Sequence, residues 1–481
     1  MISKKIIVAT TLENMEVQLI LSMANRHGLI TGATGTGKTV TLQRLAEQFS
    51  LAGIPIFLTD VKGDLAGLAC AGANSPATCS VNFWDLYGEK GLPLRTTVSE
   101  IGPILIGRIL EVNSVQQGIL NAAFSLADDQ KLLLLDLKDL QSLLDWIVNH
   151  VDQIRTEYGN FSRSSVGAIQ RSILSLSEAG GDKFFSEPAL QLEHIMQQDK
   201  SGNGIINILD GVQLINNPLL YTSFLLWLLS ELFKQLPEVG DLDKPKLIFF
   251  FDESHLLFNS ASKSLLEKIE QIVRLIRSKG VGIYFVSQCP SDISDNVLSQ
   301  LSNRIQHALR AFTPKDQKAV KAAAQTFRQN LKINVEKVIT ELKVGEALIS
   351  FLDEEGSPIP VEKAKVILPN SRMGAISEQE RNTLIQNSAY YSFYKKTVDR
   401  ESAYEMIKQK LEAQQKIIQS RAESATQPIQ IESPAKPRGR PRQSVYEIFI
   451  KSTARALGSK LGQQIIRGVL GSIFGSKKSK K

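Results

Sequence analysis

The feature that most constrains the fold is a glycine-rich octapeptide at residues 32–39, Gly-Ala-Thr-Gly-Thr-Gly-Lys-Thr. It matches the phosphate-binding pattern G-x-x-x-x-G-K-[ST]. It follows a short apolar run, Gly28–Thr31, and precedes a segment, Val40–Leu51, whose apolar residues recur at helical spacing. A strand, a glycine-rich turn and a helix in this order predict a parallel α/β fold that binds a nucleotide at the carboxyl edge of its sheet.

Each residue type in the loop has its own chemical task. The glycines permit the dihedral angles that turn several backbone N–H groups toward one phosphate. Lys38 supplies a mobile charge for the β- and γ-phosphates, and the Thr39 hydroxyl is placed to ligate Mg²⁺. The cofactors that we expect are therefore ATP and Mg²⁺. The predicted nucleotide-binding residues are Gly32, Ala33, Thr34, Gly35, Thr36, Gly37, Lys38, Thr39 and Val40.

A second segment supplies two acids. Lys246–Phe251 predicts a strand buried on both faces, and Asp252 and Glu253 follow it directly. We expect Asp252 to hold Mg²⁺ through its water shell, and Glu253 to orient and deprotonate the attacking water. Two adjacent acids indicate hydrolysis rather than phosphoryl transfer to a small acceptor. A strand end with two solvated acids is the alternative.

Further polar residues follow other predicted strands. Gln288, after Val281–Val286, is a candidate sensor of the γ-phosphate or of the water, or a polar strand end without a catalytic role. Arg304 is a candidate to stabilise the transition state at a neighbouring subunit's nucleotide, or else a surface arginine. In Asp60–Asp64, Asp60 and Lys62 either help to set the nucleotide or form a capped turn. The rivals of Arg304 are Arg274, Arg277 and Arg310.

The rest of the chain is divided by composition and periodicity. Apolar residues make up 43% of the 481 residues and charged residues 22%, which excludes wholesale disorder. Three cysteines without metal-site spacing indicate thiols in a reducing cytosol. The expected segments are 1–94 and 201–376 as the two halves of the α/β core, 95–200 as a helical insertion, 377–421 as polar helices, 422–443 as a flexible basic linker and 444–481 as a basic helical tail.

Charge is concentrated in that tail. The net charge is +7, but residues 436–481 carry +11, which leaves −4 for residues 1–435. Pro437–Pro441 matches the core of a minor-groove AT-hook, and Val445–Phe474 predicts an amphipathic basic helix. Such a helix suits DNA phosphates or an anionic membrane, or it docks on its own core. No signal peptide or membrane-spanning run is visible, so we expect a cytoplasmic protein, peripheral at the inner membrane or nucleoid if the tail binds there.

Together these motifs resemble a known family, the HerA/FtsK superfamily of P-loop ATPases, and within it the YjgR-like bacterial branch of HerA-like helicases. The resemblance covers residues 1–375 and continues into the tail. It implies a RecA-like core with a mainly parallel central sheet, a hexameric ring, and relatives that move double-stranded DNA through the ring or unwind it. The segments that carry the resemblance are His27–Gln43, Asp60–Asp64, Leu247–His255, Ile272–Gln288 and Asn303–Pro314.

The expected function is thus a Mg²⁺-dependent ATP hydrolase, with DNA translocation or helicase-like unwinding by a homo-hexamer as its output. Two alternatives stay open. One is a membrane-associated ATPase of the conjugation or assembly type. The other is a nucleotide-gated binding or signalling module with slow turnover.

Overall fold

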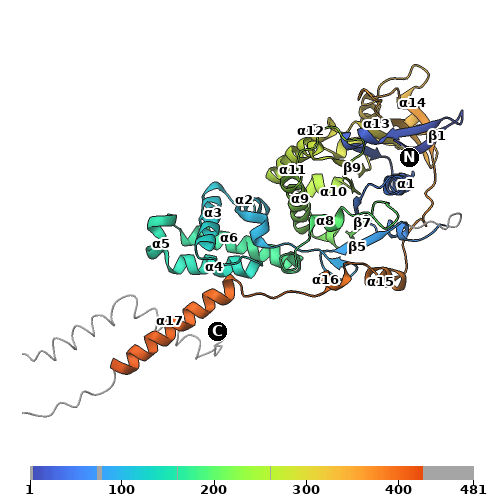
Figure 1. Ribbon diagram of the computed structural model, residues 1–481. Helices are drawn as coiled ribbons and strands as arrows, with labels where there is room; N and C mark the ends of the chain where they lie inside the picture. The colour runs from blue at the N-terminus through green and yellow to red at the C-terminus, as the bar shows by residue number, and fades with distance from the viewer. Residues whose placement is uncertain (1–3, 73–78, 160, 261, 426–481) are drawn as a thin grey trace, which may run out of the picture. The chain divides into compact units, whose positions relative to one another are not determined.

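The computed structural model describes residues 4–72, 79–159, 161–260 and 262–425 (Figure 1). The chain forms two compact units, Met1–Gln414 and Gln415–Lys481. Most of the second unit lies outside the described residues, and so do the AT-hook match and the predicted tail helix. The sheet and the sites discussed below all belong to the first unit.

One twelve-stranded sheet organises the first unit, in the order β2-β1-β12-β11-β10-β3-β9-β8-β4-β7-β5-β6. The eight strands from β10 to β6 are parallel, whereas β11, β12, β1 and β2 pair antiparallel. The sheet is therefore mainly parallel, as predicted. The strands are β1 (Lys5–Thr11), β2 (Glu16–Ile20), β3 (Gly28–Thr31), β4 (Ile56–Asp60), β5 (Val81–Asp85), β6 (Leu92–Pro93), β7 (Ile206–Asp210), β8 (Leu247–Phe251), β9 (Val281–Ser287), β10 (Asn303–Gln306), β11 (Glu346–Ser350) and β12 (Glu362–Val366).

The described α-helices connect and cover these strands. Helices α2 to α8 all lie in sequence between β6 and β7, and α2 contacts α9 and α11 of the core. Several start at side-chain caps, such as Thr97, Asn113 and Asp136, because a capping oxygen satisfies an otherwise unpaired helical N–H group. The first helices are α1 (Lys38–Leu51), α2 (Val98–Ile109), α3 (Ser114–Asp129), α4 (Leu137–Asn149), α5 (Val151–Tyr158), α6 (Arg163–Leu176), α7 (Asp182–Phe184) and α8 (Leu192–Ile195). The others are α9 (Pro218–Gln235), α10 (His255–Ser260), α11 (Lys263–Ile276), α12 (Asp295–Leu298), α13 (Pro314–Gln325), α14 (Val335–Glu341), α15 (Glu378–Gln386), α16 (Tyr391–Lys395) and α17 (Ala403–Ala425).

The centre of the sheet is buried and rich in aromatic side chains. Every residue of β8 is fully buried. The Phe249 ring lies 5.1 Å from that of Phe57 on β4, and the Phe251 ring lies 5.3 Å from that of Phe285 on β9. Large apolar side chains on both faces are what a parallel strand covered by helices requires. This packing fixes the strand ends from which the polar loops emerge.

The long apolar helix α9 is a core helix. Twelve of its 18 residues are buried, including Glu231, which accepts a hydrogen bond of 2.5 Å from Gln235. Within the described ranges, no helix is both long and apolar enough to cross a membrane.

The segment after β12 lies against the parallel half of the sheet. Glu47 of α1 accepts hydrogen bonds from the backbone N–H groups of Asn370 (2.9 Å) and Ser371 (2.5 Å). Arg381 of α15 pairs with Asp210 at the end of β7, at 3.1 Å. Polar helices were expected over 377–421; the structure has α15, α16 and α17 there, and α17 continues to Ala425, past the expected start of the linker at residue 422.

Two expectations about strands need correction. The apolar run over residues 305–312 predicts a strand there, but β10 covers only Asn303–Gln306. Beyond it, the carbonyl oxygen of Ala308 accepts a hydrogen bond from Ala33 of the phosphate loop instead of continuing the sheet. The sequence also does not predict β1, β2, β5, β6 or β12. β1, β2 and β12 mix polar with apolar residues at one end of the sheet, where burial of one face suffices. β5 and β6, at the other end, are only five and two residues long.

Candidate nucleotide site

The predicted polar residues meet because their strands are neighbours. β9 lies between β3 and β8, and Thr31 pairs with Ser287 at the ends of β3 and β9. β4 lies on the other side of β8, with Thr59 opposite Phe251. The phosphate loop, the acids after β8 and the loop after β4 therefore emerge at one edge of the sheet, as expected for parallel strands.

The phosphate loop has the backbone geometry that its glycines permit. Gly35 and Gly37 have φ angles of +77° and +119°, in the left-handed region that side chains disfavour. At Gly32, a Cβ atom would lie 2.5 Å from the Cβ atom of His307. Helix α1 begins at Lys38, so its first N–H groups have no intrahelical acceptor. This is a helix amino terminus suited to an anion.

Lys38 is buried at the bottom of the loop. Its Nζ donates to the carbonyl oxygens of Gly32 (2.7 Å) and Ala33 (3.2 Å). Burial lowers the pKa of Lys38, against the attraction of Glu253 and Asp252. The lysine and the two acids thus act on one another electrostatically, which brings the two predicted halves of the site together.

The two acids after β8 differ in their surroundings. Asp252 is buried, and burial together with the charge of Glu253 raises its pKa to about 7. Glu253 has φ +47°, a conformation that costs a non-glycine residue about 1–3 kcal/mol. Burial raises the pKa of Glu253, but its ion pair with Lys62 outweighs this and leaves the pKa below its usual value. His255 Nδ1 lies 3.1 Å from the other carboxylate oxygen.

The loop after β4 supplies this ion pair. Asp60 accepts hydrogen bonds from the backbone N–H groups of Gly63 (2.7 Å), Asp64 (3.2 Å) and Leu65 (3.1 Å), so it caps the turn. The turn places Lys62 against Glu253 and Asp64 against the hydroxyl of Thr39. Asp60 thus caps the turn, and Lys62 of the same turn pairs with Glu253, whereas a role of Asp60 and Lys62 in setting the nucleotide stays a prediction.

The residues present fit a hard divalent cation. One carboxylate oxygen of Asp252 and one of Asp64 are buried, and neither has a hydrogen-bond partner in the described part of the chain. The Thr39 hydroxyl lies beside Asp64. No group of three or more His, Cys, Asp or Glu residues converges as a metal cage among the described residues. Mg²⁺ is commonly held by one or two carboxylates, phosphate oxygens and water, so these few oxygens are a suitable set.

Gln288 and Arg304 are placed differently. Gln288 is exposed directly after β9, at the edge that carries the site. Arg304 lies on β10, where its guanidinium donates to the carbonyl oxygens of Leu301 (3.0 Å), Leu298 (3.0 Å) and Thr326 (3.3 Å) of its own subunit. Its role in trans stays a prediction. Its rivals are Arg274 and Arg310, both exposed, and Arg277, which lies 3.8 Å from Asp241.

His307 supports the phosphate loop, a role that the sequence did not indicate. Its Nε2 lies 2.8 Å from the hydroxyl of Thr41 on α1, and its Nδ1 lies 2.9 Å from the carbonyl oxygen of Glu346. Burial lowers its pKa to about 4, so the ring is neutral near pH 7. A lone histidine without ligand spacing gives no signal of this kind, because Thr41 and Glu346 are far from it in sequence.

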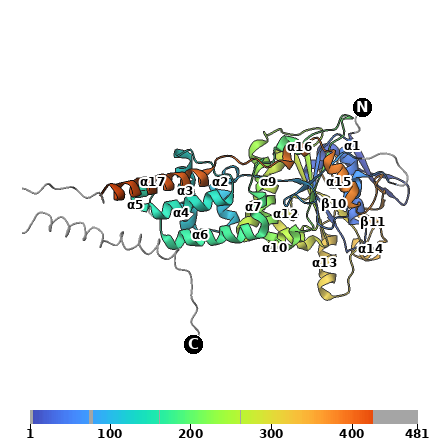
Figure 2. The same cartoon turned by 90° about the horizontal axis from the view of Figure 1, so that it is seen from below.

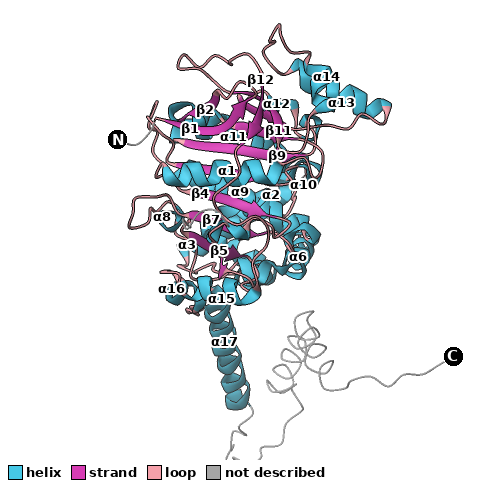
Figure 3. Ribbon diagram, turned by 90° about the vertical axis from the view of Figure 1, so that its right-hand side faces the viewer, coloured by secondary structure: helices cyan, strands magenta, loops and turns pink. Residues whose placement is uncertain are grey.

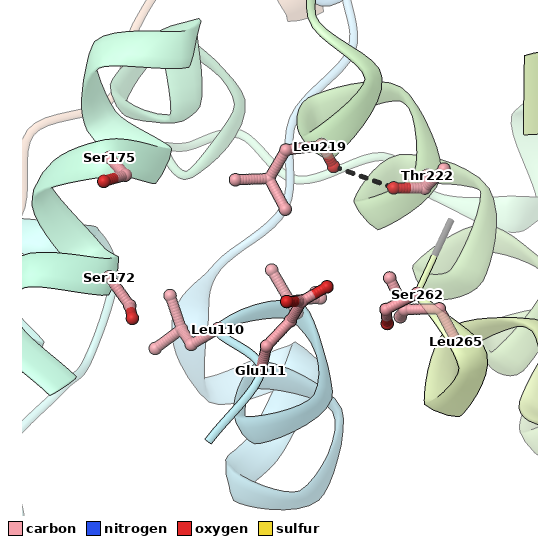
Figure 4. A pocket seen from close by; sticks show the side chains of 9 residues that line it. Leu110, Glu111, Ser172, Ser175, Leu219, Thr222, Ser262 and Leu265 are labelled. Carbon is pink, nitrogen blue, oxygen red and sulfur yellow. Dashed lines mark hydrogen bonds between the residues drawn. The ribbon is translucent and has the colours of Figure 1, made fainter. Parts of the chain in front are cut away.

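A separate cavity of about 420 Å³ lies where insertion helices α2 and α6 approach core helices α9 and α11 (Figure 4). Its wall includes the hydroxyls of Ser172, Ser175 and Thr222, and Thr222 donates a 3.1 Å hydrogen bond to the carbonyl oxygen of Leu219. None of the residues that line it belongs to the predicted site. The nucleotide site and this cavity are thus distinct features.

Comparison with known proteins gives both relatives and fold neighbours. The DNA double-strand break repair helicase HerA of Saccharolobus solfataricus is 26% identical over 348 residues, which cover 70% of this chain and 64% of the relative. The chain thus matches less than two thirds of that relative's length. A bacterial conjugative coupling protein, TrwB, superposes with a TM-score of 0.53 at 15% identity, over 77% of this chain and 91% of TrwB. VirB4 of Thermoanaerobacter pseudethanolicus superposes with a TM-score of 0.51 at 12% identity, over 76% of this chain and 97% of VirB4.

These likenesses confirm the predicted fold, a P-loop ATPase core with a mainly parallel sheet. The family model of the HerA-like helicase C-terminal region matches residues 5–479, which is nearly the whole chain. The phosphate loop, the paired acids and the capped turn after β4 all lie within this match. The chain therefore belongs to the HerA-like helicase family of the HerA/FtsK superfamily of P-loop ATPases.

Proposed function

We propose that this protein is a Mg²⁺-dependent ATPase. The observation that carries the proposal is the ion pair between Lys62 and Glu253, in the same electrostatic cluster as Lys38 of the phosphate loop. A carboxylate held charged and in a strained conformation, beside a loop with phosphate-binding geometry, is what a water-activating base requires. Mg²⁺ would bind at Thr39 and Asp252, and it would neutralise charge on the phosphates.

The roles of the other residues follow from their positions. Lys38 binds the β- and γ-phosphates, and Glu253 accepts the proton of the attacking water. Lys62 pairs with Glu253, and its charge adds to the effect of burial in lowering the pKa of Lys38. Lys62 thus keeps Glu253 ionised and positioned, and it adds a second positive charge where the γ-phosphate would lie. Gln288 would contact that phosphate or the water.

The proposed output of hydrolysis is movement on DNA by a ring of six subunits. Membership in the HerA-like family and the name of the archaeal relative, a DNA repair helicase, support this proposal. A transition-state arginine from a neighbouring subunit would link turnover to assembly. If Arg304 has this role, its guanidinium must leave three carbonyl acceptors of its own subunit.

The first experiment compares Lys38→Ala with Lys200→Ala, a change at an exposed lysine remote from the loop in sequence. Lys38→Ala should abolish tight binding of a fluorescent ATP analogue and phosphate release, because it removes the buried charge. Lys200→Ala should leave both unchanged. Equal hydrolysis by the parent and Lys38→Ala would contradict the proposed site.

The second experiment tests assembly. Arg304→Ala subunits and Glu253→Gln subunits should both be inactive alone. Mixing them should restore part of the phosphate release, because some interfaces then join an intact Glu253 to an intact Arg304. A fully active monomer would contradict the ring. If the Arg304→Ala protein is active, the transition-state arginine supplied by the neighbouring subunit would be Arg274 or Arg310 instead.

A further inference from the structure

The segment from Arg310 to Lys343, which we call the basic hairpin, carries a strong positive charge. It contains eight Lys or Arg residues against three acids, a net charge of +5. Residues 1–435 together carry −4, so the rest of that body carries −9. The hairpin is therefore a local cationic surface on an acidic body. Its basic residues are Arg310, Lys315, Lys318, Lys321, Arg328, Lys332, Lys337 and Lys343.

Three of these charges, on helix α13, are available to a partner. Helices α13 and α14 pack in a small apolar cluster that is separate from the main core, and Leu348 of β11 also belongs to this cluster. Lys315, Lys318 and Lys321 recur at every third position of α13, and all three are exposed. None of the three forms an ion pair with an acid of the described chain. Figures 2 and 3 show α13 projecting from the sheet-bearing body.

The residues that flank the hairpin on each side are hydrogen-bonded to the phosphate loop. On the entering side, Ala33 N donates to the carbonyl oxygen of Ala308 at 2.8 Å. On the leaving side, Gly345 N donates to the carbonyl oxygen of Thr36 at 3.0 Å. A shift of the phosphate loop would therefore reach both ends of the hairpin directly.

From these observations we propose that the basic hairpin binds the phosphate backbone of duplex DNA, in a way that depends on the nucleotide at the phosphate loop. Exposed lysines in a row on one helix suit a linear array of phosphates. Phe312, 86% exposed just before α13, adds an apolar contact beside them. The proposal rests on the proposed ATPase for its coupling to nucleotide, but not for the DNA contact itself.

The test uses the full chain with Lys315, Lys318 and Lys321 all replaced by alanine. The matched control replaces Lys395, Lys396 and Lys410, which are also exposed and lie far from the hairpin in sequence. DNA affinity is measured against salt concentration with a labelled duplex of random sequence. Loss of three phosphate contacts should make the negative slope of log K against log salt shallower by about 2.7. It should also weaken binding on the order of a hundredfold at 0.1 M salt.

Lysine-to-arginine replacement at the same three positions should restore binding, because it restores the charge. Basal phosphate release by the triple alanine variant should equal that of the parent, while its stimulation by duplex DNA is lost. The proposal is overturned if the hairpin and control variants bind DNA equally well. It is also overturned if the hairpin variant loses binding only to anionic vesicles or only to RNA, or if it loses self-association while still binding DNA. A parent that binds DNA through the hairpin but hydrolyses no ATP would contradict the proposed ATPase alone.

Discussion

The nucleotide site and the basic hairpin use charge in opposite ways. In the site, Lys38, Asp252 and Glu253 are buried together with shifted pKa values, and each depends on the others. On the hairpin, the lysines of α13 are exposed and have no ion-pair partner among the described residues. Charges interact strongly where water is excluded and weakly where it is not. A single substitution should therefore be decisive in the site, whereas on the hairpin substitutions should have small and additive effects.

The largest effect expected is that of Glu253→Gln. The amide keeps the shape but cannot accept a proton, so phosphate release should fall by about 10²–10⁴-fold. ATP should still bind, because Lys38 and the loop are intact. Rapid-quench hydrolysis and equilibrium binding of ATP measure the two properties separately. A variant that loses binding as much as hydrolysis would show that Glu253 has a structural role instead.

The next effect is that of Lys62→Ala, which frees Glu253 from its ion pair. Misplacement of a catalytic group by about 1 Å costs about 10²-fold, so hydrolysis should fall by that order. Without the lysine, the pKa of Glu253 should rise, and the acid limb of the pH–rate profile should move to higher pH. Lys62→Arg should keep the profile of the parent. An unchanged acid limb in Lys62→Ala would contradict this positioning role.

A third effect concerns stability and pH. The pKa of Asp252 is about 7 in the folded chain and 3.8 when unperturbed. The stability linked to its protonated form is fully present below pH 3.8 and is lost as the pH rises through 7, because the folded state then holds a buried charge. Asp252→Asn should therefore unfold several degrees above the parent at pH 8, and at the same temperature near pH 4. Scanning calorimetry without Mg²⁺ measures this, and a gap that is equal at both pH values would contradict the assignment.

The smallest effect is that of a single hairpin residue. Lys318→Ala should make the negative slope of log K against log salt shallower by about 0.9. The unfolding temperature and the basal ATPase rate should stay unchanged. Titrations of labelled duplex at several salt concentrations measure it. A change in slope much larger than about 0.9 from this single substitution would show that the hairpin charges depend on one another. The proposed difference between the exposed hairpin and the buried site would then be wrong.

The sequence was informative where local chemistry sets the structure. The pair Gly37 and Lys38 is typical of the phosphate loop at the start of a helix, so this loop could be predicted. Leu247–Phe251 is wholly apolar, so β8 and the acids that follow it could be predicted as well. β12, with the sequence Glu-Lys-Ala-Lys-Val, has no such signal, because its pairing with β11 and β1 decides it. The contact of Lys62 with Glu253 joins residues far apart in the chain. Its existence depends on β4 and β8 being neighbours, which no local pattern specifies.

The most direct test of the account is phosphate release by the full chain, measured with and without duplex DNA in three proteins. We expect the parent to hydrolyse ATP and to be stimulated by DNA. Glu253→Gln should be inactive in both conditions. The triple alanine variant at Lys315, Lys318 and Lys321 should keep the basal rate and lose the stimulation. Hydrolysis by Glu253→Gln at the parental rate, or full DNA stimulation of the triple variant, would contradict the division between a buried catalytic site and an exposed DNA contact.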